Sequence, residues 1–100
     1  MPPDAVFDAL GNANRREIVR FLAGGPLPVG DIARKLPVSR PAVSKHLRIL
    51  EQAGLVAHVS DGTRNVFRLA PGGYEAARGW LDGFWSQALG RFAFVAESTP

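Results

Sequence analysis

Residues 39–56 read SRPAVSKHLRILEQAGLV, and this stretch decides the fold. Ser39 is a residue type that caps helix N-termini, and Pro41 is tolerated in a first helical turn. Gly54 can end the helix in the left-handed conformation, which costs a glycine little. The stretch therefore predicts one helix followed by a sharp change of direction.

The predicted helix has two unlike faces. At about 100° per residue, Val43, Leu47 and Leu50 fall on one side, where we expect them to pack against a core. The opposite side carries a proline and polar residues, namely Pro41, Ser44, Lys45 and Arg48. One face of the helix is thus expected to pack and the other to contact a ligand.

A short helix is predicted just before this one. Residues 29–35 place Ile32 and Ala33 at core spacing, and the helix stops because Pro37 disfavours a helical conformation in the residue before it. Two short helices joined by a turn of about three or four residues are typical of a helix-turn-helix, whose second helix can enter the major groove of DNA.

A β-hairpin is predicted directly after the second helix. Residues 55–59 and 64–69 are rich in β-forming residues, and Ser60-Asp61-Gly62-Thr63 separates them. Asp-Gly between two such runs is a strong hairpin signal. A hairpin in this place is a wing, so the sequence predicts a winged helix-turn-helix with the recognition helix at 39–53 and the wing at 55–69.

Three further helices complete the prediction, over residues 4–10, residues 13–22 after the cap residue Asn12, and residues 73–95. The predicted fold class is mainly α with a small β-hairpin (α+β), with the hairpin between the fourth and fifth of five helices. We expect residues 1–100 to form a single domain with N- and C-terminal dimerisation helices.

The last predicted helix holds six of the nine aromatic residues. One small core cannot easily bury so many aromatic side chains. The helix either pairs with a second copy about a two-fold axis, together with the first helix, or folds back on its own domain. Pairing predicts an interface made of Val6, Phe7, Leu10, Tyr74, Trp80, Leu81, Phe84, Trp85, Ala88 and Phe92. The rings of Trp80, Phe84 and Trp85 then either pack in this interface or line a small apolar pocket there.

Positive charge is concentrated in the middle of the chain. The net charge of +3 divides into 0 for residues 1–30, +4 for residues 31–70 and −1 for residues 71–100. This distribution favours a localised surface for a polyanion over a uniformly basic coat, although a solvated charged face would give the same balance.

The residues expected to contact DNA follow from their place on the recognition helix and wing. Base edges are assigned to the N-terminal half of the helix and phosphate to a later turn, which gives Arg40, Pro41, Ser44 and Lys45 for bases and Arg48 for phosphate. Arg64, beside the hairpin turn, is expected to reach the minor groove or its phosphates. Ser39 caps the helix and is expected to meet a phosphate as well, or caps alone. His46 either packs internally or reaches the DNA backbone.

Several classes of function are excluded or disfavoured. The chain has no cysteine, so it has neither a disulfide nor a thiolate metal site. His46 and His58, the only histidines, form no recognisable ligand set, and neither a metal nor a cofactor is predicted. An exposed carboxylate site for a hard cation is left open. Without a phosphate loop or a nucleophile motif, we do not expect an enzyme. No stretch reaches the roughly 18 apolar residues of a membrane span, and a cytoplasmic location is expected.

The sequence resembles the ArsR (SmtB/ArsR) family of winged-helix transcriptional repressors in the segments ALGNANRREIVRFL, VGDIARKL, SRPAVSKHLRILEQAGLV and DGTRNVFRL. The resemblance implies a homodimer with paired terminal helices that binds double-stranded DNA at a palindromic operator. Many members release DNA when metal binds to cysteines near the third helix or to acids and histidines on the last helix. This chain lacks both ligand patterns, so it resembles the branch without them, and its effector is left open.

One alternative function uses the same fold. A winged helix can serve as a protein-protein interaction module without sequence-specific DNA binding. The basic face that contains Arg40, Lys45 and Arg48 argues against this reading, since such a module has no need of it.

Overall fold

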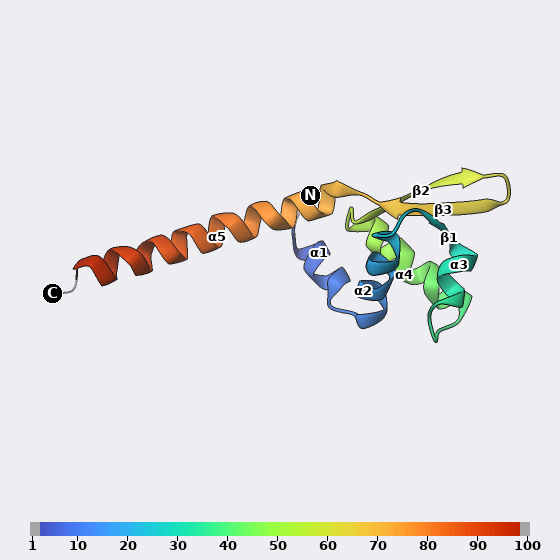
Figure 1. The fold of residues 1–100 in the computed structure, drawn as a ribbon, viewed down its shortest axis with the longest axis horizontal. Helices are drawn as coiled ribbons and strands as arrows, with labels where there is room; N and C mark the ends of the chain where they lie inside the picture. The colour runs from blue at the N-terminus through green and yellow to red at the C-terminus, as the bar shows by residue number, and fades with distance from the viewer. Residues whose placement is uncertain (1–2, 99–100) are drawn as a thin grey trace.

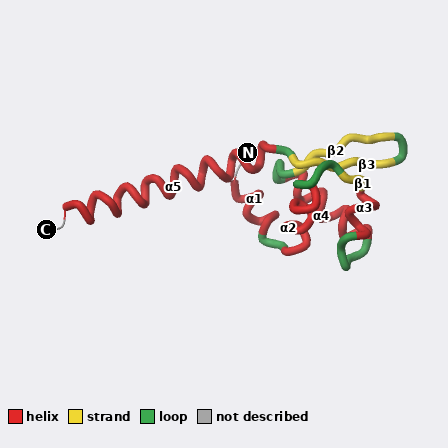
Figure 2. The backbone as a smooth tube through the Cα atoms, viewed as in Figure 1, coloured by secondary structure: helices red, strands yellow, loops and turns green. Residues whose placement is uncertain are grey.

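The computed structural model describes residues 3–98, and the side chains of residues 3–91. Its elements are α1 (Pro3–Leu10), α2 (Ala13–Leu22), β1 (Leu27–Pro28), α3 (Val29–Arg34), α4 (Arg40–Gln52), β2 (Val56–Asp61), β3 (Arg64–Leu69) and α5 (Pro71–Ser98). Figure 1 shows α1 to α4 gathered below the sheet, with α5 leaving to one side. Figure 2 separates the helices from the hairpin by colour. The fold is mainly helical with a small antiparallel sheet, as predicted.

The helices begin at the caps that the sequence predicts. The Asn12 side chain accepts hydrogen bonds from the backbone N–H groups of Asn14 at 2.9 Å and Arg15 at 3.2 Å, at the start of α2. Ser39 Oγ accepts from the N–H of Ala42 at 3.3 Å, at the start of α4. Each cap satisfies donors that a helix start leaves unpaired.

A single apolar core holds the helices together. Its fully buried large side chains come from α1, α2, α3, α4 and β2, and they are Val6, Ile18, Ile32, Val43, Leu47, Leu50 and Val56. The inward face of α4 is therefore the one expected from its periodicity, and α3 packs against it as a helix-turn-helix requires.

The hairpin is the predicted wing, and it belongs to a larger sheet. β2 and β3 pair antiparallel from Val56↔Leu69 to Asp61↔Arg64, and Gly62 at the tip has a φ of 64°. A third strand, β1, pairs with β3 through Leu27↔Phe67 and Pro28↔Val66. This strand could not be predicted from the sequence, because two residues, one of them proline, are too few to show the alternation of a β-strand.

One close contact joins α4, the wing and α5. Gly54 ends α4 with a φ of 76°, and its carbonyl oxygen accepts a hydrogen bond of 2.8 Å from the N–H of Gly73 in the first turn of α5. A Cβ on Gly73 would lie 2.3 Å from the carbonyl oxygen of Ala53, so no other residue fits there without movement of backbone. α5 begins at Pro71, two residues before the predicted start, because proline is well suited to a first helical position.

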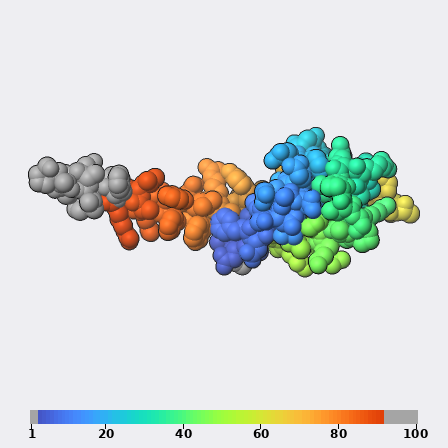
Figure 3. Space-filling view, turned by 90° about the horizontal axis from the view of Figure 1, so that it is seen from below, coloured from blue at the N-terminus to red at the C-terminus, as the bar shows by residue number. Residues whose placement is uncertain are grey.

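The fifth helix extends well beyond the rest of the molecule. Its 28 residues span about 42 Å at about 1.5 Å per residue. The Cα radius of gyration is 17.9 Å, against roughly 13 Å for a compact chain of this length. Figure 3 shows α1 beside the first part of α5 and the later part reaching past it. Folding back over the domain, the alternative considered for this helix, does not occur.

None of the described helices is both long enough and apolar enough to cross a membrane.

Substitutions at the two neighbouring glycines test the contact at the start of α5. Gly73→Ala is expected to lower the free energy of unfolding by about 1–3 kcal/mol, since its methyl group meets backbone that must shift. Gly72→Ala meets nothing within 4 Å and is expected to be neutral or to stabilise the protein by up to about 1 kcal/mol. Urea unfolding at one fixed protein concentration measures both, and equal stabilities would show that the contact is unimportant.

Candidate nucleic-acid interface

The outward face of α4 carries the residues assigned to DNA. Arg40, Pro41, Ser44, Lys45 and Arg48 are all exposed, as is the cap residue Ser39. No core side chain interrupts this face, because the buried residues of α4 lie on its other side. The side chains are thus free to meet a ligand along about two and a half helical turns.

A polar groove of about 510 Å³ lies between α3, α4 and the wing. Three arginines from three elements line it, namely Arg34 of α3, Arg40 of α4 and Arg64 of β3. Arg40 reaches toward α3, since its Nη1 would lie 3.9 Å from a Cβ on Gly30. The carboxylate of Asp31 also lines the groove. Three arginines against one aspartate leave a net positive charge, drawn from segments that are far apart in the sequence.

Arg34 was not among the predicted site residues. Its Nη1 donates to Asp31 Oδ1 at 2.9 Å, one turn earlier in α3. The only sequence signal for it was the positive balance of residues 31–70, which does not single out a residue. Its place in the groove depends on how α3 packs against α4 and the sheet.

Most of the positive charge at this surface has no acidic partner. Among the residues whose side chains the structure describes, Arg40, Lys45, Arg48 and Arg64 form no ion pair. Unneutralised guanidinium and ammonium groups raise the local positive potential, which attracts a polyanion such as the nucleic-acid backbone.

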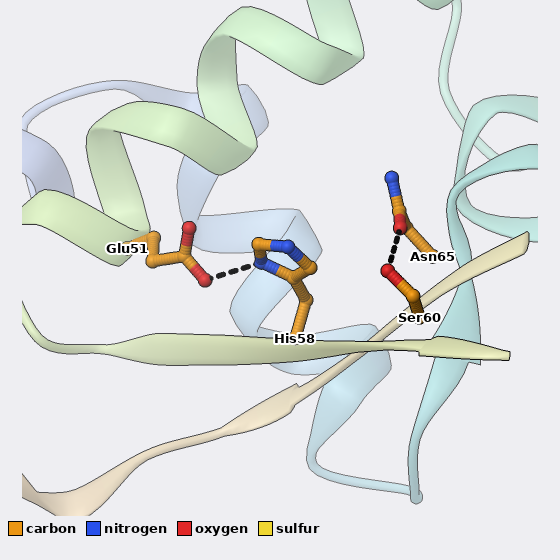
Figure 4. A network of polar contacts seen from close by, with 4 residues as sticks. All are labelled: Glu51, His58, Ser60 and Asn65. Atoms are coloured by element: carbon orange, nitrogen blue, oxygen red, sulfur yellow. Dashed lines mark hydrogen bonds and ion pairs between the residues drawn. The ribbon is translucent and has the colours of Figure 1, made fainter.

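The wing is fastened to the end of α4 by a contact that the sequence did not predict. His58 Nδ1 of β2 lies 2.6 Å from Glu51 Oε1 of α4, and the His58 ring lies against Phe67 with centroids 4.9 Å apart. Figure 4 shows this pair, and next to it Ser60 Oγ donating to Asn65 Oδ1 across the hairpin at 3.1 Å. No local pattern pairs a helix glutamate with a strand histidine across a turn.

His46 makes an internal contact rather than standing free on the outer face. It is half-buried, and its Nδ1 lies 3.3 Å from Nη1 of Arg15 in α2. Burial lowers the pKa of His46 below its ordinary value of 6.5, and the positive charges of Arg15 and Lys45 lower it further. This contact is the internal one of the two predicted for His46, and the contact with the DNA backbone stays a prediction.

The residues assigned to a dimer interface fall into three groups. Exposed side chains run along α5 and onto α1, and these are Phe7, Tyr74, Trp80, Leu81, Phe84 and Trp85. Leu10 and Ala88 are half-buried, and Val6, at 1% exposure, belongs to the core of the single chain, so almost none of its surface is left for a second copy. The side chain of Phe92 lies outside the described residues.

The exposed aromatic rings contact one another. Trp80 and Phe84 stack with centroids 5.3 Å apart, and the rings of Phe7 of α1 and Trp80 form a T-shaped pair with centroids 5.7 Å apart. An apolar hollow of about 270 Å³ lies between α1 and α5, lined by residues that include Phe7, Leu10, Tyr74 and Leu81. Trp80, Phe84 and Trp85 do not line this hollow. Whether these rings pack or line a pocket between two copies stays a prediction.

Within the part of the chain whose side chains are described, no three histidine or acidic residues come together as a metal site would require.

The fold and this surface define the class of the protein, a winged helix-turn-helix protein with an arginine-lined groove beside its second helix. The model of the family described as "Bacterial regulatory protein, arsR family" matches residues 12–58. HTH-type transcriptional regulator Rv2034 of Mycobacterium tuberculosis is 51% identical over 96 residues, which cover 96% of this chain and 90% of that protein. The chain belongs to the ArsR family.

Two further comparisons agree with this assignment. Transcriptional repressor SdpR of Bacillus subtilis is 42% identical over 52 residues, covering 52% of this chain and 58% of that protein. An ArsR-like transcriptional regulator from Rhodococcus sp. RHA1 has a solved structure that aligns with a TM-score of 0.78 and 31% identity, over 97% of this chain and 92% of that one. The chain is thus a transcriptional regulator, and the expectation that it is not an enzyme is confirmed by these relatives.

Removing the contact between α4 and the wing is expected to loosen the hairpin. Glu51→Ala and His58→Ala should each speed amide hydrogen exchange in β2 and β3 by about two- to tenfold, the effect of losing one hydrogen bond of about 0.5–1.5 kcal/mol. Glu17→Ala is the matched control, because it removes a carboxylate paired with Arg20 within α2. If the hairpin exchanges equally fast in all three variants, the pair does not hold the wing.

Proposed function

We propose that the protein is a homodimeric repressor that binds a palindromic DNA operator, with α4 in the major groove and the wing beside it. The observation that carries this proposal is the groove where Arg34, Arg40 and Arg64 converge next to the exposed polar face of α4. A duplex presents phosphates on both sides of its major groove, so a helix flanked by arginines on either side suits it.

Each residue of this surface has a proposed role. Arg40, Pro41, Ser44 and Lys45 contact base edges, with guanine the target of a bidentate Arg40 or of Lys45. Arg48 contacts phosphate from a later turn of the helix. Arg34, placed in the groove by the fold, joins the residues proposed to contact phosphate.

Two residues at the ends of this surface complete the assignment. Arg64 lies at the register position next to the hairpin turn and contacts the minor groove or its phosphates. Ser39 caps α4, and the exposed first turn beside it is available to a phosphate.

The dimer is proposed from the exposed apolar surface of α5. Trp80, Phe84 and Trp85 are each about half exposed in the single chain, and α5 projects where it cannot bury them itself. Pairing α1 and α5 of two copies would cover these rings. A two-fold pair carries two reading helices, which is why a palindromic operator is expected.

Repression and location are the remaining parts of the proposal. The relative SdpR is named as a transcriptional repressor, and the present chain is similar to it through the helix-turn-helix. A repressor blocks transcription by occupying its operator, so we expect it to act where the chromosome lies, in the cytoplasm.

Titration on DNA tests the reading surface. A duplex from the region upstream of the gene should bind about 10³-fold or more tightly than a scrambled duplex, and affinity should fall steeply with salt. Arg40→Ala should cost about 1–3 kcal/mol and relax the base preference, whereas Arg64→Ala should weaken all duplexes alike. Arg20→Ala, on α2 and outside the groove, controls for the lost charge. Weak and equal binding to both duplexes would instead favour a protein-protein interaction module.

Sedimentation tests the dimer. Trp80→Ala combined with Phe84→Ala should weaken self-association at least about a hundredfold, because buried aromatic residues dominate interface energies. Val59→Ala removes an equally exposed apolar side chain from the wing and should leave self-association unchanged. A stable dimer of the double variant would show that the interface lies elsewhere.

A further inference from the structure

A single guanidinium group connects three helices. Arg15, in the first turn of α2, donates from Nε to the carbonyl oxygen of Ala9 at 2.6 Å and from Nη2 to that of Asp8 at 3.2 Å. Its Nη1 lies 3.3 Å from Nδ1 of His46 in α4. Arg15 therefore touches the end of α1 and the middle of α4 at the same time.

On the α1 side, Arg15 acts as a C-terminal cap. The last carbonyl groups of a helix have no partner within it, and the negative end of the helix dipole favours a cation there. Arg16 does the same from the neighbouring position, since its Nη1 donates to the carbonyl oxygen of Leu10 at 2.8 Å. Of these two arginines, only Arg15 also contacts α4 among the described side chains.

On the α4 side, the contact with Arg15 determines the protonation state and the tautomer of the His46 ring. Arginine can only donate, so Nδ1 must accept, and the ring is then neutral with its proton on Nε2. The charged groups that act on His46 are Arg15 from α2 and Lys45 from α4, and both favour the neutral ring. α1 takes part through backbone carbonyl oxygens bonded to Arg15.

His46 stands between Lys45 of the reading face and Leu47 of the core. A restraint on its ring is therefore a restraint on how α4 is rotated and tilted relative to α1. We propose that Arg15 is a positioning residue that holds the recognition helix in its DNA-reading orientation by joining His46 to the C-terminus of α1. This inference rests on the proposed function, and it links the helix proposed for the dimer interface to the helix proposed to read DNA.

A restraint between Arg15 and His46 predicts that DNA affinity changes with pH in the opposite direction from a direct contact between His46 and DNA. Protonation of His46 removes the acceptor at Nδ1 and places two positive charges together. The restraint is therefore lost as the pH falls through the lowered pKa of His46, which lies below its ordinary value. DNA affinity is therefore expected to fall when the restraint is lost. A protonated His46 lying on phosphate would instead bind more tightly in acid.

Two pairs of variants isolate the restraint. Arg15→Ala removes two hydrogen bonds to the C-terminus of α1 and Arg16→Ala removes one, but only the first variant also loses a contact with α4. His46→Asn keeps an acceptor near the position of Nδ1 without a titrating ring, whereas His46→Leu keeps the bulk and loses the acceptor.

The DNA measurement uses a duplex enriched from a random-sequence pool by the unchanged protein. At pH 7.5, Arg15→Ala and His46→Leu are expected to bind it about tenfold more weakly, while Arg16→Ala and His46→Asn stay within about threefold. Between pH 7.5 and 5.5 the unchanged protein should lose more affinity than His46→Asn. Equal effects of Arg15→Ala and Arg16→Ala, or tighter binding by the unchanged protein in acid, would overturn the inference.

A measurement without DNA separates this inference from the proposed function. In the free protein, Arg15→Ala should raise the pKa of His46 by NMR titration and speed amide exchange in α4, and Arg16→Ala should do neither. If no duplex is enriched, the proposed function fails while these two readouts still decide the restraint. If both are unchanged in Arg15→Ala, the restraint does not exist.

Discussion

The hydrogen bond between Gly54 and Gly73 is the contact on which the arrangement of the molecule depends. Gly54 ends α4 in a left-handed conformation, the chain then runs through the whole wing, and Gly73 returns it to the same place. The two backbones approach so closely that a side chain on Gly73 has no room. The end of the recognition helix, the base of the wing and the start of α5 are therefore fixed at one point.

This junction separates the molecule into two kinds of surface. On one side lie the polar face of α4 and the groove with Arg34, Arg40 and Arg64. On the other, α5 leads away from the core (Figure 1), and its aromatic rings Trp80, Phe84 and Trp85 are exposed. A chain of 100 residues has a thin core, and the apolar surface of α5 is more than that core can cover. The charge and the apolar area thus serve different contacts at different ends.

Local sequence signals predicted the elements whose structure is decided locally. The two faces of α4 follow from the spacing of Val43, Leu47 and Leu50, and the wing follows from Asp61-Gly62 between two β-rich runs. β1 could not be predicted, because two residues become a strand only when β3 is beside them.

The same reason explains what was missed in the candidate site. Arg34 enters the groove, Glu51 meets His58 and Arg15 meets His46 only after helices distant in sequence have packed. Sequence periodicity places a side chain on a face of its own element, but it does not give the partner that this face will meet. The reading face could therefore be predicted, and the contacts that orient it could not.

Those missed contacts restrain α4 from three directions. Its end is bonded to α5 through Gly54 and Gly73, its last turn to the wing through Glu51 and His58, and its middle to α1 through His46 and Arg15. Each restraint ends on an element that is itself part of a proposed contact with DNA or with a second copy. The orientation of the reading helix is consequently coupled to how α1 and α5 are arranged. In a chain without cysteine, a thiolate metal switch is chemically excluded. These same bonds join the α1 and α5 surface to the face of α4 that is proposed to read DNA.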